Sequence, residues 1–159
     1  MTTDVTIRPA RPEDVERLGE LAGQLVRQHH DADPGRFMLV PDVEWGYGRW
    51  LGREAKRRGA VVLVAERADA VVGYAYGALG GRDWNELLDE HAAVHDILVD
   101  APHRKGGIGG LLLDALLARL EALGAARIVL KTMVANQPAQ RLFESRGFRR
   151  TMIEMTRGG

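Results

Sequence analysis

The chain has 159 residues, enough to bury a sizeable core, and we expect residues 1–159 to form a single domain. Lysine plus arginine and aspartate plus glutamate both number 22, and this zero net charge argues against a dedicated nucleic-acid-binding protein. Cysteine is absent from the sequence, which excludes disulfides, thiolate metal sites and a thiol nucleophile. Apolar runs are too short to span a membrane and the first residues contain no apolar signal segment, so we expect a cytoplasmic protein without a membrane partner.

The first half of the chain is predicted to contain a strand, two helices and a β-hairpin. A short strand at Val5–Arg8 precedes a helix at Pro12–His29, whose apolar residues fall on one face. A second helix is predicted at Asp42–Arg58, where three glycines lower its intrinsic stability. Ala60–Ala65 and Val71–Ala78 are expected to pair as an antiparallel hairpin.

The second half of the chain is predicted to alternate between strands and helices. An apolar strand at His91–Val99 is followed by an amphipathic helix at Ile108–Leu123 and a strand at Arg127–Thr132. Because a helix connects these two strands, we expect them to lie parallel. A last helix at Asn136–Gly147 and a final strand at Phe148–Thr156 complete the prediction.

A glycine-rich turn connects the strand His91–Val99 to the helix that begins near Ile108. Backbone N–H groups at a helix N-terminus lack intrahelical partners and carry partial positive charge, so they attract anions. Glycines also allow phosphate groups to approach the backbone without meeting a Cβ. The residues predicted to form this phosphate-binding turn are Arg104, Lys105, Gly106, Gly107, Ile108, Gly109 and Gly110.

Two common phosphate-binding patterns do not fit this turn. The sequence contains no Gly-x-x-x-x-Gly-Lys-[Ser/Thr] segment, which excludes a P-loop. A Gly-x-Gly-x-x-Gly pattern that starts at Gly107 would place its third glycine at Leu112, and the turn lies too late in the chain for a Rossmann domain.

The turn instead matches Arg104-x-x-Gly107-x-Gly109 at the start of an amphipathic helix. It resembles the [Arg/Gln]-x-x-Gly-x-[Gly/Ala] signature of the GNAT superfamily of acyl-CoA-dependent N-acetyltransferases. A downstream stretch is similar to the second signature of that family, and it reads Asn136-x-x-Ala139-x-x-Leu142-Phe143-x-x-x-Gly147-Phe148. The order of predicted elements also resembles the family from Thr6 to Thr156.

The resemblance implies an α/β (α+β) fold of GNAT type, with a mixed central β-sheet whose two parallel strands splay apart between flanking helices. Acetyl-CoA would lie between those strands, and residues 104–110 would hold its pyrophosphate. The backbones of Ile97, Leu98 and Val99 would pair with the pantetheine arm in the manner of an added strand. Asn136 matches an asparagine beside the cofactor, and it also suits the N-cap of a helix.

Members of this family transfer the acetyl group to an amine by direct attack, so a base must remove a proton from the amine. The candidates are His95 and Asp96, which strand alternation places on opposite faces. An N–H of Leu98 or Val99 is expected to stabilise the oxyanion. Phe143 stands where relatives frequently carry a tyrosine that protonates the thiolate, so a tyrosine such as Tyr74 or Tyr76, or a water, would have to replace it.

The acceptor is expected to be a primary amine of a small molecule, or of a peptide or protein. A catalytically weak, regulatory acyl-CoA-binding module is the alternative, and a homodimer is expected from the frequency of dimers among relatives. No metal is expected, because the polar loop between the first two helices is more typical of a solvated surface than of a metal site. The residues proposed for the acceptor side are His29, His30, Asp31, Asp33, Trp45, Tyr47, Trp50, Trp84 and Glu86.

Overall fold

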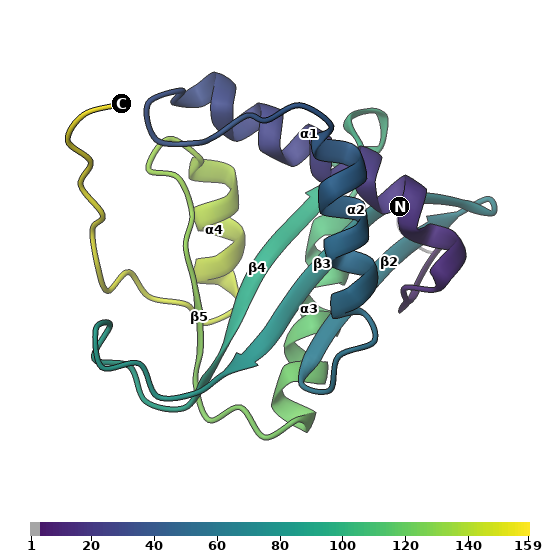
Figure 1. Cartoon of the computed structure of the whole chain (residues 1–159). Coiled ribbons are helices and arrows are strands. Elements are labelled where there is room, and N and C mark those ends of the chain that lie inside the picture. Colours follow the sequence, from purple (N-terminus) through teal and green to yellow (C-terminus); the bar gives the residue numbers. More distant parts are fainter. Residues whose placement is uncertain (1–3) are drawn as a thin grey trace.

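The computed structural model describes residues 4–159, which contain a five-stranded mixed sheet with helices on both faces (Figure 1). The strands lie side by side in chain order, antiparallel from β1 to β4, with β5 parallel to β4. Their bounds are β1 Val5–Pro9, β2 Ala60–Arg67, β3 Ala70–Gly80, β4 His91–Val99 and β5 Ile128–Leu130. The α/β class and mixed sheet predicted from the sequence are therefore confirmed.

Helices α1 and α2 cover one face of the sheet and α3 covers the other (Figure 1). Short 3₁₀ turns precede α1 (η1, Pro12–Asp14) and follow β4 (η2, Ala101–His103). The α-helices are α1 Val15–Ala32, α2 Val43–Glu54, α3 Ile108–Ala122 and α4 Gln137–Ser145. The fourth helix packs Leu142 and Phe143 against the apolar cluster on the α3 face.

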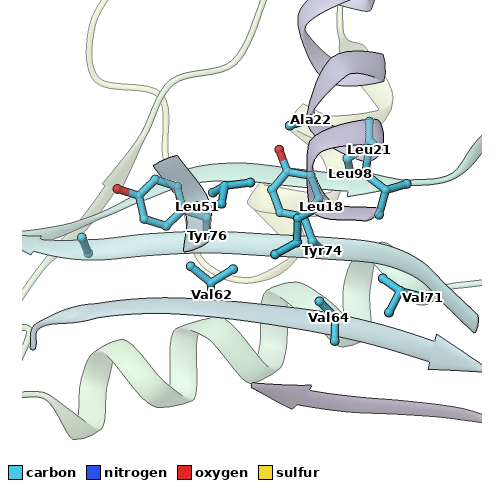
Figure 2. Close-up of a cluster of buried hydrophobic side chains, with 11 residues drawn as sticks. Leu18, Leu21, Ala22, Leu51, Val62, Val64, Val71, Tyr74, Tyr76 and Leu98 are labelled. Atoms are coloured by element: carbon cyan, nitrogen blue, oxygen red, sulfur yellow. The ribbon is translucent and has the colours of Figure 1, made fainter. Parts of the chain in front are cut away.

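The apolar cluster on the α1/α2 face brings the two helices onto the centre of the sheet (Figure 2). The buried side chains in this cluster are Leu18, Leu21, Ala22, Leu51, Val62, Val64, Val71, Tyr74, Tyr76, Ala78 and Leu98. Two glycines let the helices approach closely, since a Cβ on Gly48 would lie 2.8 Å from the carbonyl oxygen of Val15 and 3.0 Å from the Cα of Gly19. Of the glycines that lower the intrinsic stability of α2, Gly48 therefore has a packing function, whereas Gly46 has open space around it.

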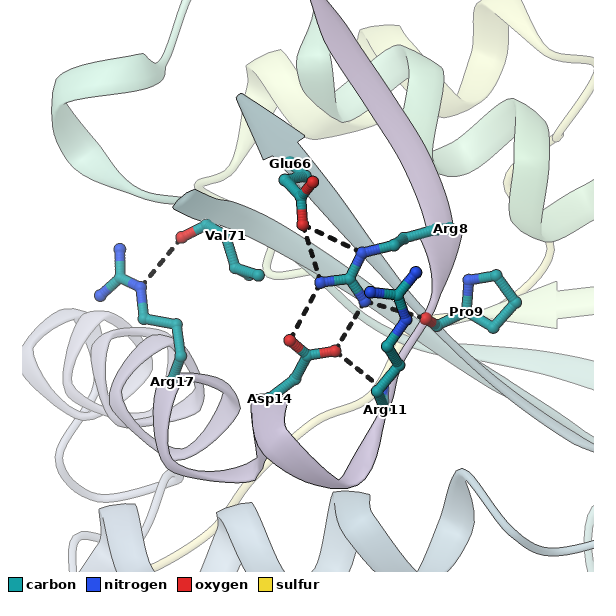
Figure 3. Close-up of polar contacts among 7 residues, drawn as sticks. All are labelled: Arg8, Pro9, Arg11, Asp14, Arg17, Glu66 and Val71. Carbon is teal, nitrogen blue, oxygen red and sulfur yellow. Dashed lines mark hydrogen bonds and ion pairs between the residues drawn. The ribbon is translucent and has the colours of Figure 1, made fainter. Parts of the chain in front are cut away.

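A network of ion pairs holds the start of α1 against the sheet (Figure 3). The guanidinium of Arg8 on β1 donates to Asp14 at 2.7 Å and to Glu66 on β2 at 2.9 Å. Arg17 donates from its Nε to the carbonyl oxygen of Val71 at 2.9 Å. Hydrogen bonds from Arg8 are the main reason that the pKa of Asp14 is lowered, so this carboxylate remains charged near neutral pH.

The predicted final strand, Phe148–Thr156, is wrong. Residues 148–159 form no helix or strand, and Met152, Ile153 and Met155 are 78–90% exposed. The segment is held instead by ion pairs, one from Arg36 to Glu154 and one from Arg150 to Glu144. The strand β5 spans only three residues rather than the predicted six, and so short an edge offers few backbone groups to a further strand.

Candidate functional site

An open strand edge lies between β4 and β5. The two strands pair only where Ala92, Ala93 and Val94 lie opposite β5, although β4 continues to Val99. Figure 1 shows the chain beyond β5 moving away from β4. The parallel strands therefore separate as predicted, and the second half of β4 has no strand on this side.

The backbone groups that face this opening can be assigned from neighbouring hydrogen bonds. Asp100 donates its N–H to Val72 at 2.8 Å, which directs the backbone of Asp100 away from the opening. Because successive residues alternate, the groups of Leu98 face β3, whereas those of Ile97 and Val99 face the opening. The carbonyl oxygen of Val99 accepts there from Arg104 Nε at 2.7 Å. Of the three residues predicted to contact the pantetheine arm through their backbones, Ile97 and Val99 direct backbone groups into the opening, and Leu98 does not.

The glycine-rich turn lies at the end of this edge. Lys105 and Gly107 have φ angles of 67° and 84°, a left-handed conformation that reverses the chain before α3 and favours glycine. The first hydrogen bond of α3 runs from Leu111 N–H to Gly107 at 3.2 Å. The N–H groups of residues 108–110 consequently have no intrahelical partner, which is the arrangement that binds anions. Ile108 anchors the helix start in the core, where it is 1% exposed.

Two other glycines of the turn have different environments. A Cβ on Gly110 would lie 2.9 Å from Nη2 of Arg146, whose guanidinium pairs with Asp114 at 2.9 Å, so this glycine permits contact between α3 and α4. Gly106 has open space, since the nearest atom to a Cβ would be the carbonyl oxygen of His103 at 3.8 Å. Gly106 and Lys105 therefore leave the outer side of the turn accessible.

Helix α1 supports the turn through three polar side chains. Gln24 donates to Asp100 Oδ1 at 2.8 Å and Arg17 donates to Asp100 Oδ2 at 2.7 Å. These hydrogen bonds, that from Gln24 foremost, lower the pKa of Asp100. With its amide oxygen turned toward the donors, Gln28 accepts from both terminal nitrogens of Arg104 at 2.7 and 2.8 Å. The turn predicted to bind phosphate is thus tied to α1, the helix that leads into the predicted acceptor-side loop.

Asn136 caps the N-terminus of α4. Its Oδ1 accepts from the N–H of Ala139 at 3.3 Å, so the capping interpretation of this residue is confirmed. The amide nitrogen makes no hydrogen bond within the described part of the chain and remains available as a donor.

The expectation that His95 and Asp96 lie on opposite faces is wrong, because β4 contains a β-bulge. Tyr76 pairs with Asp96 and Gly77 pairs with Val94, so His95 is an extra residue in β4. Before the bulge, Val94 packs into the cluster under α3; after it, Leu98 packs into the cluster under α1 and α2. Both polar side chains therefore face α1 and α2.

Asp96 is a buried carboxylate between two tyrosines. Tyr47 Oη on α2 donates to Asp96 Oδ2 at 2.6 Å, and Tyr74 Oη on β3 donates to the same oxygen at 2.9 Å. Burial raises the pKa of Asp96, while the two phenol hydrogen bonds act in the opposite direction by stabilising the charged form. Because both phenols use Oδ2, Oδ1 is left to accept from another donor.

A second polar group surrounds His95. Its ring stacks on Tyr76 with centroids 5.0 Å apart, and the Tyr76 hydroxyl donates to Glu54 on α2. Arg57 donates to the other oxygen of Glu54 at 2.6 Å, and this bond is the main reason that the pKa of Glu54 is lowered. The His95 ring is partly shielded from water, which lowers its pKa, so the imidazole is neutral at pH 7.

Sequence reasoning missed Glu54. An acid near the end of an amphipathic helix is normally solvated, and only the packing of α2 on the sheet shows that this one is 4% exposed. The predicted replacements for a tyrosine at Phe143 are both engaged, since Tyr74 binds Asp96 and Tyr76 binds Glu54. Phe143 itself packs edge-to-face on Phe148, with ring centroids 6.0 Å apart.

The predicted acceptor-side residues are only partly brought together. A cavity of about 420 Å³ lies beside the C-terminal half of α1, and it is lined by Leu25, Val26, His29, Arg36, Phe37 and Met38. His29 borders it, and Tyr47 reaches Asp96 nearby. Trp45, Trp50 and Trp84 instead have 45–78% of their surface exposed.

The histidines between α1 and α2 have structural hydrogen bonds. The Nδ1 atoms of His29 and His30 lie 2.8 Å from the carbonyl oxygens of Leu25 and Phe37. Across residues 4–159, no group of three or more histidine or acidic side chains is placed to hold a metal ion. Among the same residues, no helix has the length and apolar character needed to cross a membrane.

Parallel strands that separate beside a glycine-rich helix start are the arrangement that the family resemblance implied. A model of the Acetyltransferase (GNAT) family matches residues 24–148, and the chain belongs to this family. The resemblance noted in the sequence is therefore confirmed. Two curated relatives are a human N-acetyltransferase 8, 32% identical over 94 residues, and the [Ribosomal protein bS18]-alanine N-acetyltransferase of Salmonella typhimurium, 28% identical over 109 residues.

These sequence matches are partial. They include 59% and 69% of this chain, but only 40% of the human protein and 67% of the Salmonella protein. Solved structures match over a greater length. The aminoglycoside N-acetyltransferase AAC(6')-Iy in complex with CoA has a TM-score of 0.75 at 18% identity, covering 98% of this chain and 94% of that one. A transcriptional regulator from Bacillus halodurans C-125 has the same TM-score at 21% identity, covering 98% and 99%. At these identities the structures show a common fold.

Proposed function

We propose that this protein transfers the acetyl group of acetyl-CoA to a primary amine of a small molecule or peptide by direct attack. The observation that carries this proposal is the continuity of the open β4 edge with the N-terminus of α3. One end offers unpaired strand groups to an extended amide-containing arm, and the other offers unpaired N–H groups to phosphates. A ligand that combines the two chemistries has the composition of coenzyme A.

The residues present fit such a ligand. The backbones of Ile97 and Val99 would pair with the pantetheine arm, and residues 104–110 would bind the pyrophosphate through N–H groups and the charges of Arg104 and Lys105. Bound acetyl-CoA supplies a thioester whose acetyl group is transferred. The Ile97 N–H is the group we assign to its carbonyl oxygen, because Leu98 faces β3 and the Val99 N–H, next to the turn, is left to the pantetheine arm.

His95 is the residue we assign to proton removal. An ammonium with a pKa near 10.4 is only about one part in a thousand neutral at pH 7, so the site must accept a proton from it. The imidazole is exposed at the bulge and has a lowered pKa, whereas Asp96 is enclosed by two phenols. Asp96 then acts as a positioning residue that fixes Tyr47 and Tyr74 beneath the bulge.

A primary-amine acceptor is supported by the charge of the surroundings and by the names of similar proteins. Asp96 places a carboxylate beside His95 that would attract a cationic amine, whereas the charge of Glu54 is offset by its ion pair with Arg57. The similar proteins are named for acetylating a ribosomal-protein alanine and for acetylating aminoglycosides. A peptide N-terminus and an amino sugar are thus the first two acceptors to test.

The test is a screen of amines for acetyl-CoA-dependent CoA release, including an alanine-terminated peptide and aminoglycosides. We expect release with at least one amine, and loss of that release in His95→Gln but not in the matched control His91→Gln on the same strand. Binding of acetyl-CoA without release across the panel would favour the regulatory-module alternative. The homodimer stays a prediction, which sedimentation equilibrium of the purified protein would test.

A further inference from the structure

Helix α2 has two faces with different chemistry. Its inner face carries Tyr47 and Glu54 toward the sheet, where they bind Asp96 and Tyr76. Its outer face carries Arg49 and Arg53, and Lys56 follows on the same side. These three cations border a surface hollow of about 320 Å³ between α2 and η1, and Arg11 completes its rim.

The hollow combines an apolar floor with a cationic rim. Apart from the four basic residues, its lining consists of Ala10, Pro12, Val15, Leu18, Gly52 and Ala55. Among the described residues, no carboxylate lines it. Of the four acids next to its lining residues in the sequence, Glu13 and Glu16 are exposed, and Glu54 and Asp14 are bound elsewhere. Glu54 turns inward to Arg57 and Tyr76, and Asp14 accepts from Arg8.

The four cations also lack carboxylate partners within the described residues. The ion pairs formed among residues 4–159 use nine other arginines and none of these side chains. Arg49 and Arg53 stack instead on Trp45 and Trp50, at 4.9 and 5.8 Å from the ring centroids. Since the whole chain is neutral, this is a local concentration of charge rather than a general basicity.

The spacing of the cations on α2 makes them repel one another. Arg49 and Arg53 are four residues apart and therefore neighbours on one face of α2, where like charges are unfavourable, and Lys56 follows in the turn after the helix. An anion between them would remove the repulsion. Arginine forks bind phosphate and carboxylate oxygens in pairs, and three arginines and one lysine line this hollow.

We propose that this hollow binds a small polyanion, a molecule that carries several phosphate or carboxylate groups. The site is distinct from the proposed acyl-CoA site, because none of its lining residues belongs to β4 or to the turn before α3. Its occupant would contact the same helix that presents Tyr47 and Glu54 to the sheet. The proposal does not depend on the enzymatic function.

The experiment is an NMR titration of the ¹⁵N-labelled protein with inorganic triphosphate and, separately, with citrate. We expect saturable shifts of the amides of residues 49–56, with at least tenfold weaker binding in Ala55→Glu, which adds an acid to the lining. Ala55→Gln is the neutral match and should bind within twofold of the parent chain. Tighter triphosphate binding assigns the site to phosphates, and tighter citrate binding assigns it to carboxylates.

A second variant removes two of the basic side chains instead of adding an acid beside them. Arg49→Ala with Arg53→Ala should weaken the response of residues 49–56 tenfold or more, while Arg82→Ala with Arg150→Ala, two exposed cations elsewhere, should not. Amides 104–110 serve as an internal reference, because any anion binding at that turn is unaffected by these changes. Equal affinities in all variants, or shifts spread evenly over the basic residues, would overturn the proposal.

Discussion

The two sides of β4 are built from different parts of the chain. On the cofactor side, the groups available to a ligand are main-chain atoms of Ile97, Val99 and residues 108–110. On the acceptor side, the groups are side chains that α2, β3 and β4 bring together around Asp96 and His95. A site made of backbone depends on conformation, whereas one made of side chains depends on each residue's identity.

The β-bulge at His95 separates the part of β4 that is paired on both edges from the part that has an open edge. Before it, β4 is paired on both edges; after it, one edge is open and two adjacent polar residues face the same helices. Substitutions on the proposed acceptor side should therefore change the catalytic rate, while substitutions on the proposed cofactor side should change the affinity for acetyl-CoA. The following experiments test that separation.

The largest effect is expected for His95→Gln, which removes the proposed proton acceptor. General-base catalysis contributes roughly 10²–10⁴-fold, so we expect kcat to fall at least a hundredfold with CoA affinity unchanged. Because the pKa of His95 is lowered below its usual 6.5, the parent rate should rise with pH through a step below 6.5 and then level off. That step should vanish in the variant. A step that survives in His95→Gln but is lost in Asp96→Asn would reassign the base to Asp96.

Tyr74→Phe should lower the free energy of unfolding, because it removes a hydrogen bond to Asp96 on the proposed acceptor side. It removes a fully buried hydroxyl that donates to a carboxylate, a bond worth about 2 kcal/mol in the free energy of unfolding at pH 7. Asp96 has a raised pKa, so acidification neutralises it in the folded protein before an ordinary aspartate, and the bond loses its charge-assisted part. The loss on substitution should shrink to about 1 kcal/mol near pH 4.

Urea unfolding of both proteins at pH 7 and pH 4 provides this measurement. An equal loss at the two pH values would mean that Asp96 does not change its charge over this range in the folded protein. Phe143→Tyr supplies a contrasting variant, since it adds a hydroxyl on the α3 face and should leave the pH dependence of unfolding unchanged.

Gly107→Val tests the proposed cofactor side, where main-chain atoms would contact the ligand. A β-branched residue at φ 84° is strained by about 1–2 kcal/mol, and relief of that strain would reshape the turn. We expect acetyl-CoA affinity to fall about tenfold, as measured by calorimetry, with the pH step of the remaining activity unchanged. Gly124→Val is the matched control, because Gly124 has φ 98° at the far end of α3. If both variants weaken binding equally, the effect comes from global stability rather than from the turn.

The difference between the two sides also explains what the sequence could predict. The glycine-rich turn was recognisable because its proposed function requires glycine at φ 84° and free N–H groups, and both requirements appear as a local pattern at Gly107. The antiparallel hairpin of β2 and β3 followed from hydrophobic periodicity, and the parallel direction of β4 and β5 followed from the crossover helix. These features involve residues close together in the chain.

The acceptor side was not predictable in the same way, because its contacts join distant residues. Tyr47 reaches Asp96 across 49 positions, and Glu54 meets Tyr76 across 22. The bulge at His95 added one residue to β4 and reversed the face of every residue after it, which alternation alone does not reveal. The prediction of a strand at Phe148–Thr156 failed for a related reason. Residues with high β-propensity form a strand only where a neighbouring strand offers a long enough edge, and β5 has only three residues.

The smallest effect is expected for Gln28→Leu, which tests whether the two sides are mechanically connected. Gln28 lies on α1 next to His29, which lines the acceptor-side cavity, and its amide oxygen accepts from Arg104 at the turn. An exposed hydrogen bond of this kind contributes about 0.5–1 kcal/mol, so removing it should weaken acetyl-CoA binding about two- to fivefold. If α1 connects the sides, KM for the amine should rise by a similar factor. Arg27→Leu, one residue earlier and paired with Glu44 on α2, should change neither value. A change in acetyl-CoA affinity alone would show that Gln28 only positions Arg104 and that the sides act independently.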